Sequence, residues 1–221
     1  MIETFAQAPG RSVRRPSFAA LSVNIKVLAA VTTAALVALI VGIVGLVSLS
    51  SASQSAQLIY TTNVASIKAV GQLRWVATQA RVDTANQALS ITAASTKKFT
   101  DSFGADEENF KTAMAAYRAS LPAANPNLLD ELQTNWDAFV TVANNELLPA
   151  GQDKRLQDWT RSRDTKSLPL LTKINEMLVT LDGIETADAS HNAAKAKSSY
   201  EASRRTAIIT LVIGLALALA M

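Results

Sequence analysis

Two uncharged apolar runs flank a longer amphipathic region of the chain. No charged residue stands between Lys26 and Lys68, and this gap contains the 23-residue apolar run VLAAVTTAALVALIVGIVGLVSL at 27–49. A run of that length crosses a bilayer as a helix. The last 16 residues, TAIITLVIGLALALAM, are also uncharged. At about 1.5 Å per residue they cover roughly 24 Å of a hydrocarbon core about 30 Å thick. The pattern predicts two transmembrane helices, the second of them truncated.

A cleaved signal peptide is the alternative interpretation of the first run. The sequence SSA at 50–52 resembles a weak cleavage site. The apolar core of a signal peptide is usually about 7–15 residues long, however, and this run is longer. We therefore expect a membrane anchor.

Between the two runs, apolar residues recur at spacings of three and four without strand-like alternation, which predicts amphipathic helices. Prolines and capping residues set their expected limits. The expected helices are one over about 23–96, a second over 97–120, a third from Pro126 to Leu148 that PAG at 149–151 ends, a short piece at 153–163, and a last helix that starts near Ser167 and Pro169 and enters the terminal run. The expected inward positions are Ile67, Val70, Leu73, Ala77, Ala80 and Ala88; Phe99, Phe103, Phe110, Met114 and Tyr117; Leu129, Leu132, Trp136, Phe139, Val140 and Ala143; and Leu171, Ile174, Leu178, Leu181 and Ile184.

The predicted fold class is all-α: a membrane-anchored antiparallel four-helix bundle whose long first and last helices are continuous with the two transmembrane helices. Since the second and third helices are shorter, we expect a two-helix stalk near the membrane, at about 50–67 and 188–205. Its Ser- and Ala-rich sequence buries little apolar area, so a second chain is expected beside it, most simply in a homodimer. The expected domains are a basic tail at 1–24, a transmembrane helix at 25–49, the bundle at 50–205 and a second transmembrane helix at 206–221.

The position of the charges predicts the topology. Residues 1–26 hold four basic side chains and one acidic one, 4 − 1 = +3, whereas residues 50–205 hold 17 of each sign. The basic excess is therefore a short tail beside a membrane helix and not a nucleic-acid surface. We expect a two-pass protein of the inner (plasma) membrane with a cytoplasmic N-terminus and a periplasmic or extracellular bundle.

The residue types exclude several kinds of chemistry. The chain has no cysteine and a single histidine, His191, so disulfides, thiolate sites and histidine-cluster metal sites are excluded. His191 is expected on the stalk surface. We find no nucleophile motif or phosphate loop, and expect no enzyme activity, cofactor or metal. The acids Asp106, Glu107 and Glu108 are interpreted as the solvated start of a helix.

Four segments carry a family resemblance: IKAVGQLRWVATQAR, DEENFKTAMAAYRASLP, LLDELQTNWDAFV and SSYEASRRTAIITLVIGLALALA. Together they resemble the four-helix-bundle sensor region of bacterial methyl-accepting chemotaxis proteins, over about 24–221. The resemblance implies that a small molecule or a ligand-loaded periplasmic binding protein binds the distal bundle, after which the last helix slides and carries the signal inward. It also implies a HAMP linker and a cytoplasmic signalling domain. Neither is in this sequence, so we expect the chain to be the N-terminal portion of a longer receptor.

Two other functions stay open. The same module precedes histidine kinases and diguanylate cyclases, so the output domain could be an enzyme. A membrane-tethered helical adaptor that binds no ligand would show the same helix pattern. The residues downstream of Met221 and the presence of a distal pocket would discriminate these alternatives.

Two arginines are the main candidates for ligand binding. Arg74 and Arg81 lie seven residues apart and so share a helix face. The resemblance implies that arginines of this helix grip carboxylates, and a guanidinium suits that task by its bidentate geometry. The alternative is a pair of surface arginines bound to acids such as Asp83. The last helix offers three possible polar partners: Lys173, Asn175 and Thr180.

Small and aromatic residues give three further expectations. A small residue recurs every fourth position in the first apolar run, at Ala30, Ala34, Ala38 and Gly42, a pattern typical of close helix packing in membranes. Trp136 is expected in the bundle core. Trp159 lies near the predicted top of the bundle. Two interpretations stay open for it, a position in the core and a position that lines a pocket.

Overall fold

The computed structural model describes the backbone of residues 22–220 and the side chains of residues 22–217. Helices make up all regular structure in this part of the chain, and no strand is present there. The all-α prediction is confirmed. Residues 1–21 of the predicted basic tail lie outside the described residues. The chain divides into two compact units, one of residues 50–200 and one that joins the residues before Ser50 to those from Glu201 onward.

The first helical stretch is continuous but ends earlier than the sequence predicted. It consists of α1 (Val23–Leu58), the π-helical segment η2 (Ile59–Val64) and α2 (Ala65–Leu89). The predicted end near residue 96 is wrong because Ser90 turns extended, with a ψ angle of 135°, and Thr92 starts a new helix. The Thr92 side chain accepts a hydrogen bond from the Ser95 backbone N–H at 3.1 Å, as a helix N-cap does. Helix α3 follows at Ala93–Ala119.

Two prolines that were expected to break or start helices lie inside them. The third stretch runs through α4 (Pro126–Val142), the π-helical η3 (Ala143–Leu147) and α5 (Leu148–Gln152), so PAG does not end it. The Leu148 N–H bonds to the Ala143 carbonyl, five residues back. This wider turn directly precedes Pro149, which cannot donate a backbone hydrogen bond and would crowd the carbonyl of an ordinary α-helical turn.

The same arrangement recurs at the start of the last helix. Helix α6 (Leu156–Ser162), the π-helical η4 (Arg163–Ser167) and α7 (Leu168–Ala220) form one stretch. The Leu168 N–H bonds to the Arg163 carbonyl, directly before Pro169. The predicted separate piece at 153–163 and the start near Ser167 are therefore corrected: the last stretch begins at Leu156.

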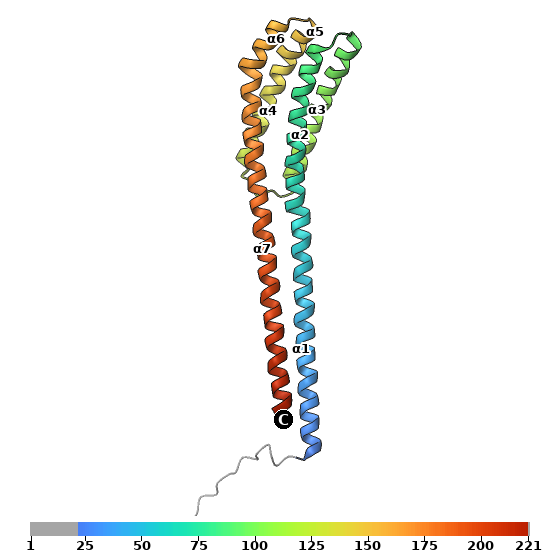
Figure 1. Cartoon of the computed structure of the whole chain (residues 1–221), viewed down its shortest axis with the longest axis vertical. Coiled ribbons are helices and arrows are strands. Elements are labelled where there is room, and N and C mark those ends of the chain that lie inside the picture. Colours follow the sequence, from blue (N-terminus) through green and yellow to red (C-terminus); the bar gives the residue numbers. More distant parts are fainter. Residues whose placement is uncertain (1–21, 221) are drawn as a thin grey trace, which may run out of the picture. The chain divides into compact units, whose positions relative to one another are not determined.

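Within residues 50–200, the four helical stretches pack side by side as a bundle (Figure 1). An aromatic cluster fills the centre between α3 and α4. The rings of Phe110 and Trp136 stack with centroids 3.9 Å apart, and Phe139 packs edge-on to Phe103 at 6.0 Å. Trp136 is 3% exposed, which confirms its predicted core position. At the distal end, Gly151 lets α5 approach α2, since a Cβ there would lie 3.0 Å from the Ala88 Cα.

The lower part of this unit has fewer helices. Helices α3 and α4 lie beside α2 and the upper part of α7 only (Figure 1). Residues 50–58 of α1 and 193–200 of α7 are exposed at nearly every position. This is the arrangement that the sequence predicted for a thin two-helix stalk, and His191 is exposed on it as expected.

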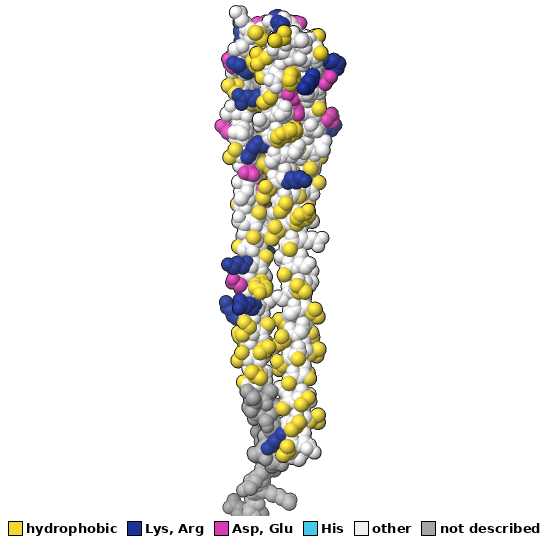
Figure 2. All heavy atoms as spheres, turned by 45° about the vertical axis from the view of Figure 1, so that its right-hand side comes forward, with side chains coloured by type: hydrophobic (Ala, Val, Ile, Leu, Met, Phe, Trp, Pro, Cys, Tyr) yellow, Lys and Arg dark blue, Asp and Glu magenta, His cyan; other side chains and the backbone are white. Residues whose placement is uncertain are grey.

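In the other unit, residues 23–49 of α1 pack against residues 201–220 of α7, and large apolar side chains are exposed along both (Figure 2). By length and composition, one helix of the described residues, Val23–Leu89, contains a stretch that could span a membrane. Gly214 is buried here, and a Cβ on it would lie 2.9 Å from the Val37 Cβ. The half-buried or buried positions are Lys26, Ala29, Ala30, Thr33, Val37, Val41, Val44 and Ser48 of α1 and Ser203, Ala207, Thr210 and Gly214 of α7.

The contact inside this unit therefore uses small residues of α7. Of the predicted small-residue face on α1, Ala30 is half-buried, whereas Ala34, Ala38 and Gly42 are exposed. Gly42 has no neighbouring atom within 4 Å of its would-be Cβ. The α1 face lies largely outside the contact with α7, and its role in contacts with a second chain stays a prediction.

Candidate functional site

A cavity of about 520 Å³ lies between α2, η3, α6, η4 and the first turns of α7. The two π-helical segments contribute directly to it, η3 through Leu147 and η4 through Arg163, Asp164 and Ser167. π-Helical turns are rare and occur frequently at functional sites. Arg81 of α2 and Trp159 of α6 complete its polar lining.

The cationic groups of this cavity differ in how they are paired. Arg163 stacks on Trp159, with the guanidinium carbon 5.1 Å from the ring centroid. Its Nε donates a hydrogen bond to Asp164 Oδ1 at 2.7 Å. Among the described residues, the Arg81 guanidinium has no hydrogen bond or ion pair. Trp159 is 8% exposed and its Nε1–H has no partner. The cavity thus offers an unpaired guanidinium and an unused indole donor beside apolar walls.

Three of the predicted site residues line one smaller cavity. Arg74, Arg81 and Asn175 border a space of about 120 Å³ between α2 and α7, and Arg81 lines both cavities. Arg74 is already engaged, since its Nη2 lies 3.8 Å from Asp182 Oδ2 and donates to the Leu178 carbonyl at 3.3 Å. Arg74 therefore fits the alternative prediction of a surface arginine bound to an acid, and that acid is Asp182.

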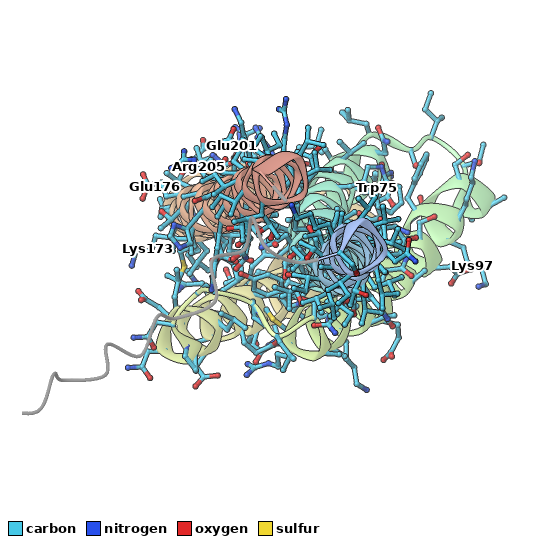
Figure 3. The ribbon with its side chains drawn as sticks, turned by 90° about the horizontal axis from the view of Figure 1, so that it is seen from below. Trp75, Lys97, Lys173, Glu176, Glu201 and Arg205 are labelled. Atoms are coloured by element: carbon cyan, nitrogen blue, oxygen red, sulfur yellow. The ribbon has the colours of Figure 1, made fainter. Side chains whose placement is uncertain are left out.

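The other two predicted partners lie away from both cavities. Lys173 is exposed and extends outward from α7, as does Glu176 (Figure 3). The Thr180 hydroxyl donates to the Glu176 carbonyl of its own helix at 2.9 Å. Asp83 does not pair with Arg81. It is 3% exposed and accepts a hydrogen bond from Gln79 Nε2.

Sequence reasoning missed Arg163, Asp164 and Ser167. For Asp164 and Ser167 the cause is the helix boundary, because they lay between a separate piece ending at 163 and a helix starting near 167. Arg163 ended the predicted piece four residues after Trp159, the spacing at which side chains on one helix meet. That spacing was the available signal.

The interpretation of Asp106 as part of a solvated helix start is wrong. Because α3 begins at Ala93, Asp106 lies in its middle, at the same face as Phe103 and Phe110, and is 3% exposed. Glu107 is half-buried and accepts a hydrogen bond from Asn144 Nδ2 at 2.9 Å. Only Glu108 is fully solvated as expected.

These features define an all-helical bundle with a cavity at one end. Within the described residues, no group of three or more His, Cys, Asp or Glu side chains could hold a metal ion. The family model of a four helix bundle sensory module for signal transduction matches residues 20–204. The chain therefore belongs to this family, the sensory modules of methyl-accepting chemotaxis-type transducers. Searches of curated protein sequences and of solved structures gave no match.

Proposed function

We propose that this sensory module binds a small ligand outside the cell and passes a helix displacement through the membrane, as part of a bacterial chemoreceptor. Family membership gives the sensory role in signal transduction. Modules of this kind are typically membrane-associated, and the apolar stretch of α1 supports a membrane anchor. The proposed topology is two-pass, with the N-terminus in the cytoplasm and the bundle outside the inner membrane.

The observation that carries ligand binding is the 520 Å³ cavity with the unpaired Arg81 guanidinium. Its volume lies in the range of small-molecule sites. A carboxylate would take the bidentate donors of Arg81, and an apolar ligand body would lie against Trp159 and Leu171. Arg74 and Asn175 border the adjoining space and could extend the site. We therefore propose a small organic acid as the ligand, bound directly or presented by a periplasmic binding protein.

The proposed route of signal transmission depends on which helices line the ligand cavity. The cavity is lined by α2 on one side and by η4 and α7 on the other. A ligand that draws these walls together displaces α7 against α2. Beyond Pro169, α7 contains no proline up to Ala220, so a displacement at the cavity is carried along a stiff helix.

A homodimer is proposed on the exposed face of α2. Large apolar side chains stand there at heptad spacing, with Trp75 53%, Val82 42% and Leu89 72% exposed. Gly71, four residues before Trp75, and Thr78, between Trp75 and Val82, are exposed on the same face. Such a seam, with small residues that permit close approach, is typical of paired helices.

The decisive experiment is a ligand screen on the full chain in lipid nanodiscs. Thermal shift and calorimetry with a panel of mono- and dicarboxylates should find an acid whose affinity falls at least about tenfold in Arg81→Ala, as loss of a charge-assisted pair requires. Arg118→Ala is the matched control, because Arg118 pairs with Asp130 away from the cavity. If Arg81→Ala binds as wild type, the site is elsewhere. If no acid binds, an adaptor without a ligand is favoured.

The identity of the cytoplasmic output domain is tested separately. The gene sequence beyond the Met221 codon distinguishes a chemoreceptor signalling domain from a histidine kinase or a cyclase. A kinase or cyclase domain there would leave the proposed sensor intact and change only its output.

A further inference from the structure

Two acids are buried on α2 and α3, helices that pack against each other, and the charge of one acts on the other. Asp83 and Asp106 are each 3% exposed. Asp83 accepts one hydrogen bond, from Gln79 Nε2 to Oδ1 at 3.2 Å. Asp106 Oδ2 is buried without any hydrogen-bond partner in the described structure. Carboxylates in such surroundings are normally paired with a cation or a set of donors.

Among residues 22–217, whose side chains the structure describes, no cationic side chain compensates this pair. On α3, the charges that flank Asp106 are directed outward, and α5, which packs on α2, carries no charged residue. The charged groups of the neighbouring elements are engaged or exposed elsewhere: Glu107 with Asn144, Glu108 with Lys111, Asp130 with Arg118, Asp137 with Gln133, Glu146 with Lys166, Arg81 at the cavity toward α7, and Glu131 in solvent. Asp83 is thus the charge that acts on Asp106.

We propose that Asp83 and Asp106 form a proton-binding site, so that the sensory module has pH as an input separate from its small ligand. Two carboxylates that are removed from water and lie close together do not both stay ionised. With one proton, one acid donates a hydrogen bond to the other and ties α2 to α3. When the proton leaves, two like charges oppose each other across the same contact, and the helix pair loosens.

The expected range of the response lies near neutrality. Burial, and then the charge of the Asp83 carboxylate, raise the pKa of Asp106 from 3.8 to about 7. A group whose pKa is raised in the folded state stabilises the fold fully below its unfolded pKa, and that stabilisation is lost as the pH rises through the folded pKa. The contact between α2 and α3 should therefore weaken progressively as the pH rises from about 4 to about 7.

Infrared spectroscopy of the full chain in nanodiscs tests the site directly. A protonated buried carboxyl gives a carbonyl stretch that ionised acids lack, so wild type should show such a band at pH 5 that disappears with a midpoint near pH 7. The band should be absent from Asp106→Asn and unchanged in Glu108→Gln, a solvated acid of the same helix. Asp83→Asn should move the midpoint to lower pH without abolishing it, since burial still acts on Asp106.

Thermal unfolding provides the second readout. Between pH 5 and pH 8, the Tm of wild type should fall by about 5–10 °C more than that of Asp106→Asn, which is neutral throughout. An acid band that persists in Asp106→Asn, or equal pH profiles for the two proteins, overturns the proposal. Recovery of the wild-type Tm at pH 8 by millimolar Na⁺ or Ca²⁺ would also overturn it and identify a cation site instead. None of these outcomes depends on the ligand of the cavity.

Discussion

The centre of the four-helix bundle and the end at which α3 connects to α4 are held together by different interactions. In the centre, aromatic rings of α3 and α4 stack and interlock, with Phe110 fully buried and Trp136 3% exposed. At the end where α3 connects to α4, several of the buried side chains are polar. Ser66 bonds to Ser120 at 2.7 Å, and the fully buried Glu185 accepts from the Tyr117 hydroxyl at 2.7 Å.

A second polar group lies at the same end. Asn63, in η2, is fully buried and donates to Asp188 Oδ2 of α7 at 2.6 Å. Asn192 donates to both of them, at 3.1 and 3.0 Å. Apolar contacts are non-directional and tolerate small shifts, whereas hydrogen bonds fix the partners that face each other. From this difference we infer that the aromatic centre supplies stability and the polar end sets the register of α7 against α2.

The largest effect is expected from the aromatic core at the centre of the bundle. Phe110→Ala removes a stacked, fully buried ring and should lower the free energy of unfolding by about 3–5 kcal/mol. Chemical denaturation of the chain in nanodiscs measures it. Phe99→Ala, at a half-buried ring of the same helix, should have a clearly smaller effect. Equal losses would show that the aromatic cluster is not the main source of stability.

An intermediate effect is expected at Tyr117. Burial, and then the hydrogen bond and charge of Glu185, raise the pKa of Tyr117 above its ordinary value of 10.0, so the hydroxyl stays protonated and donating at neutral pH. Tyr117→Phe leaves the buried Glu185 carboxylate with only the Ala124 N–H as a partner. It should lower the free energy of unfolding by about 1.5–3 kcal/mol. Tyr60→Phe, at a hydroxyl on an exposed ring, should change little, and a loss as small for Tyr117→Phe would contradict the role of the polar end.

The buried apolar residues of the bundle could be predicted from the sequence, whereas the buried polar residues could not. The spacing of Phe103, Phe110 and Trp136 is sufficient to place them inside, because period 3.6 and large apolar side chains identify a core face. Buried polar residues have no such signal: Asp106 and Asn63 look like surface residues until their partners on another helix are known. The π-helical turns likewise give no signal in the spacing of apolar residues. They let Pro149 and Pro169 lie inside helices, so the predicted helix boundaries were wrong and Asp164 and Ser167 were missed as candidate site residues.

The smallest effect on stability, and the sharpest test of the comparison, is expected at Asn63. Asn63→Leu replaces a small polar side chain by an apolar one of similar size and leaves Asp188 and Asn192 with each other. The expected loss is about 1–2 kcal/mol, below that of Tyr117→Phe. If the polar end fixes the register, this variant should alter the position of α7 more than Phe110→Ala does, although it destabilises the protein less.

Disulfide mapping measures that position without interference, because the chain has no cysteine of its own. Paired cysteines at exposed sites on the facing stretches of α1 and α7 near residues 57 and 195 should cross-link in a single register in wild type. Asn63→Leu should spread cross-linking over neighbouring pairs. Thr61→Ala, which removes an exposed hydroxyl bonded to its own helix in the same segment, should keep the wild-type pattern. A pattern unchanged in Asn63→Leu would mean that packing along the whole helix pair, and not the polar end, sets the register through which the signal must pass.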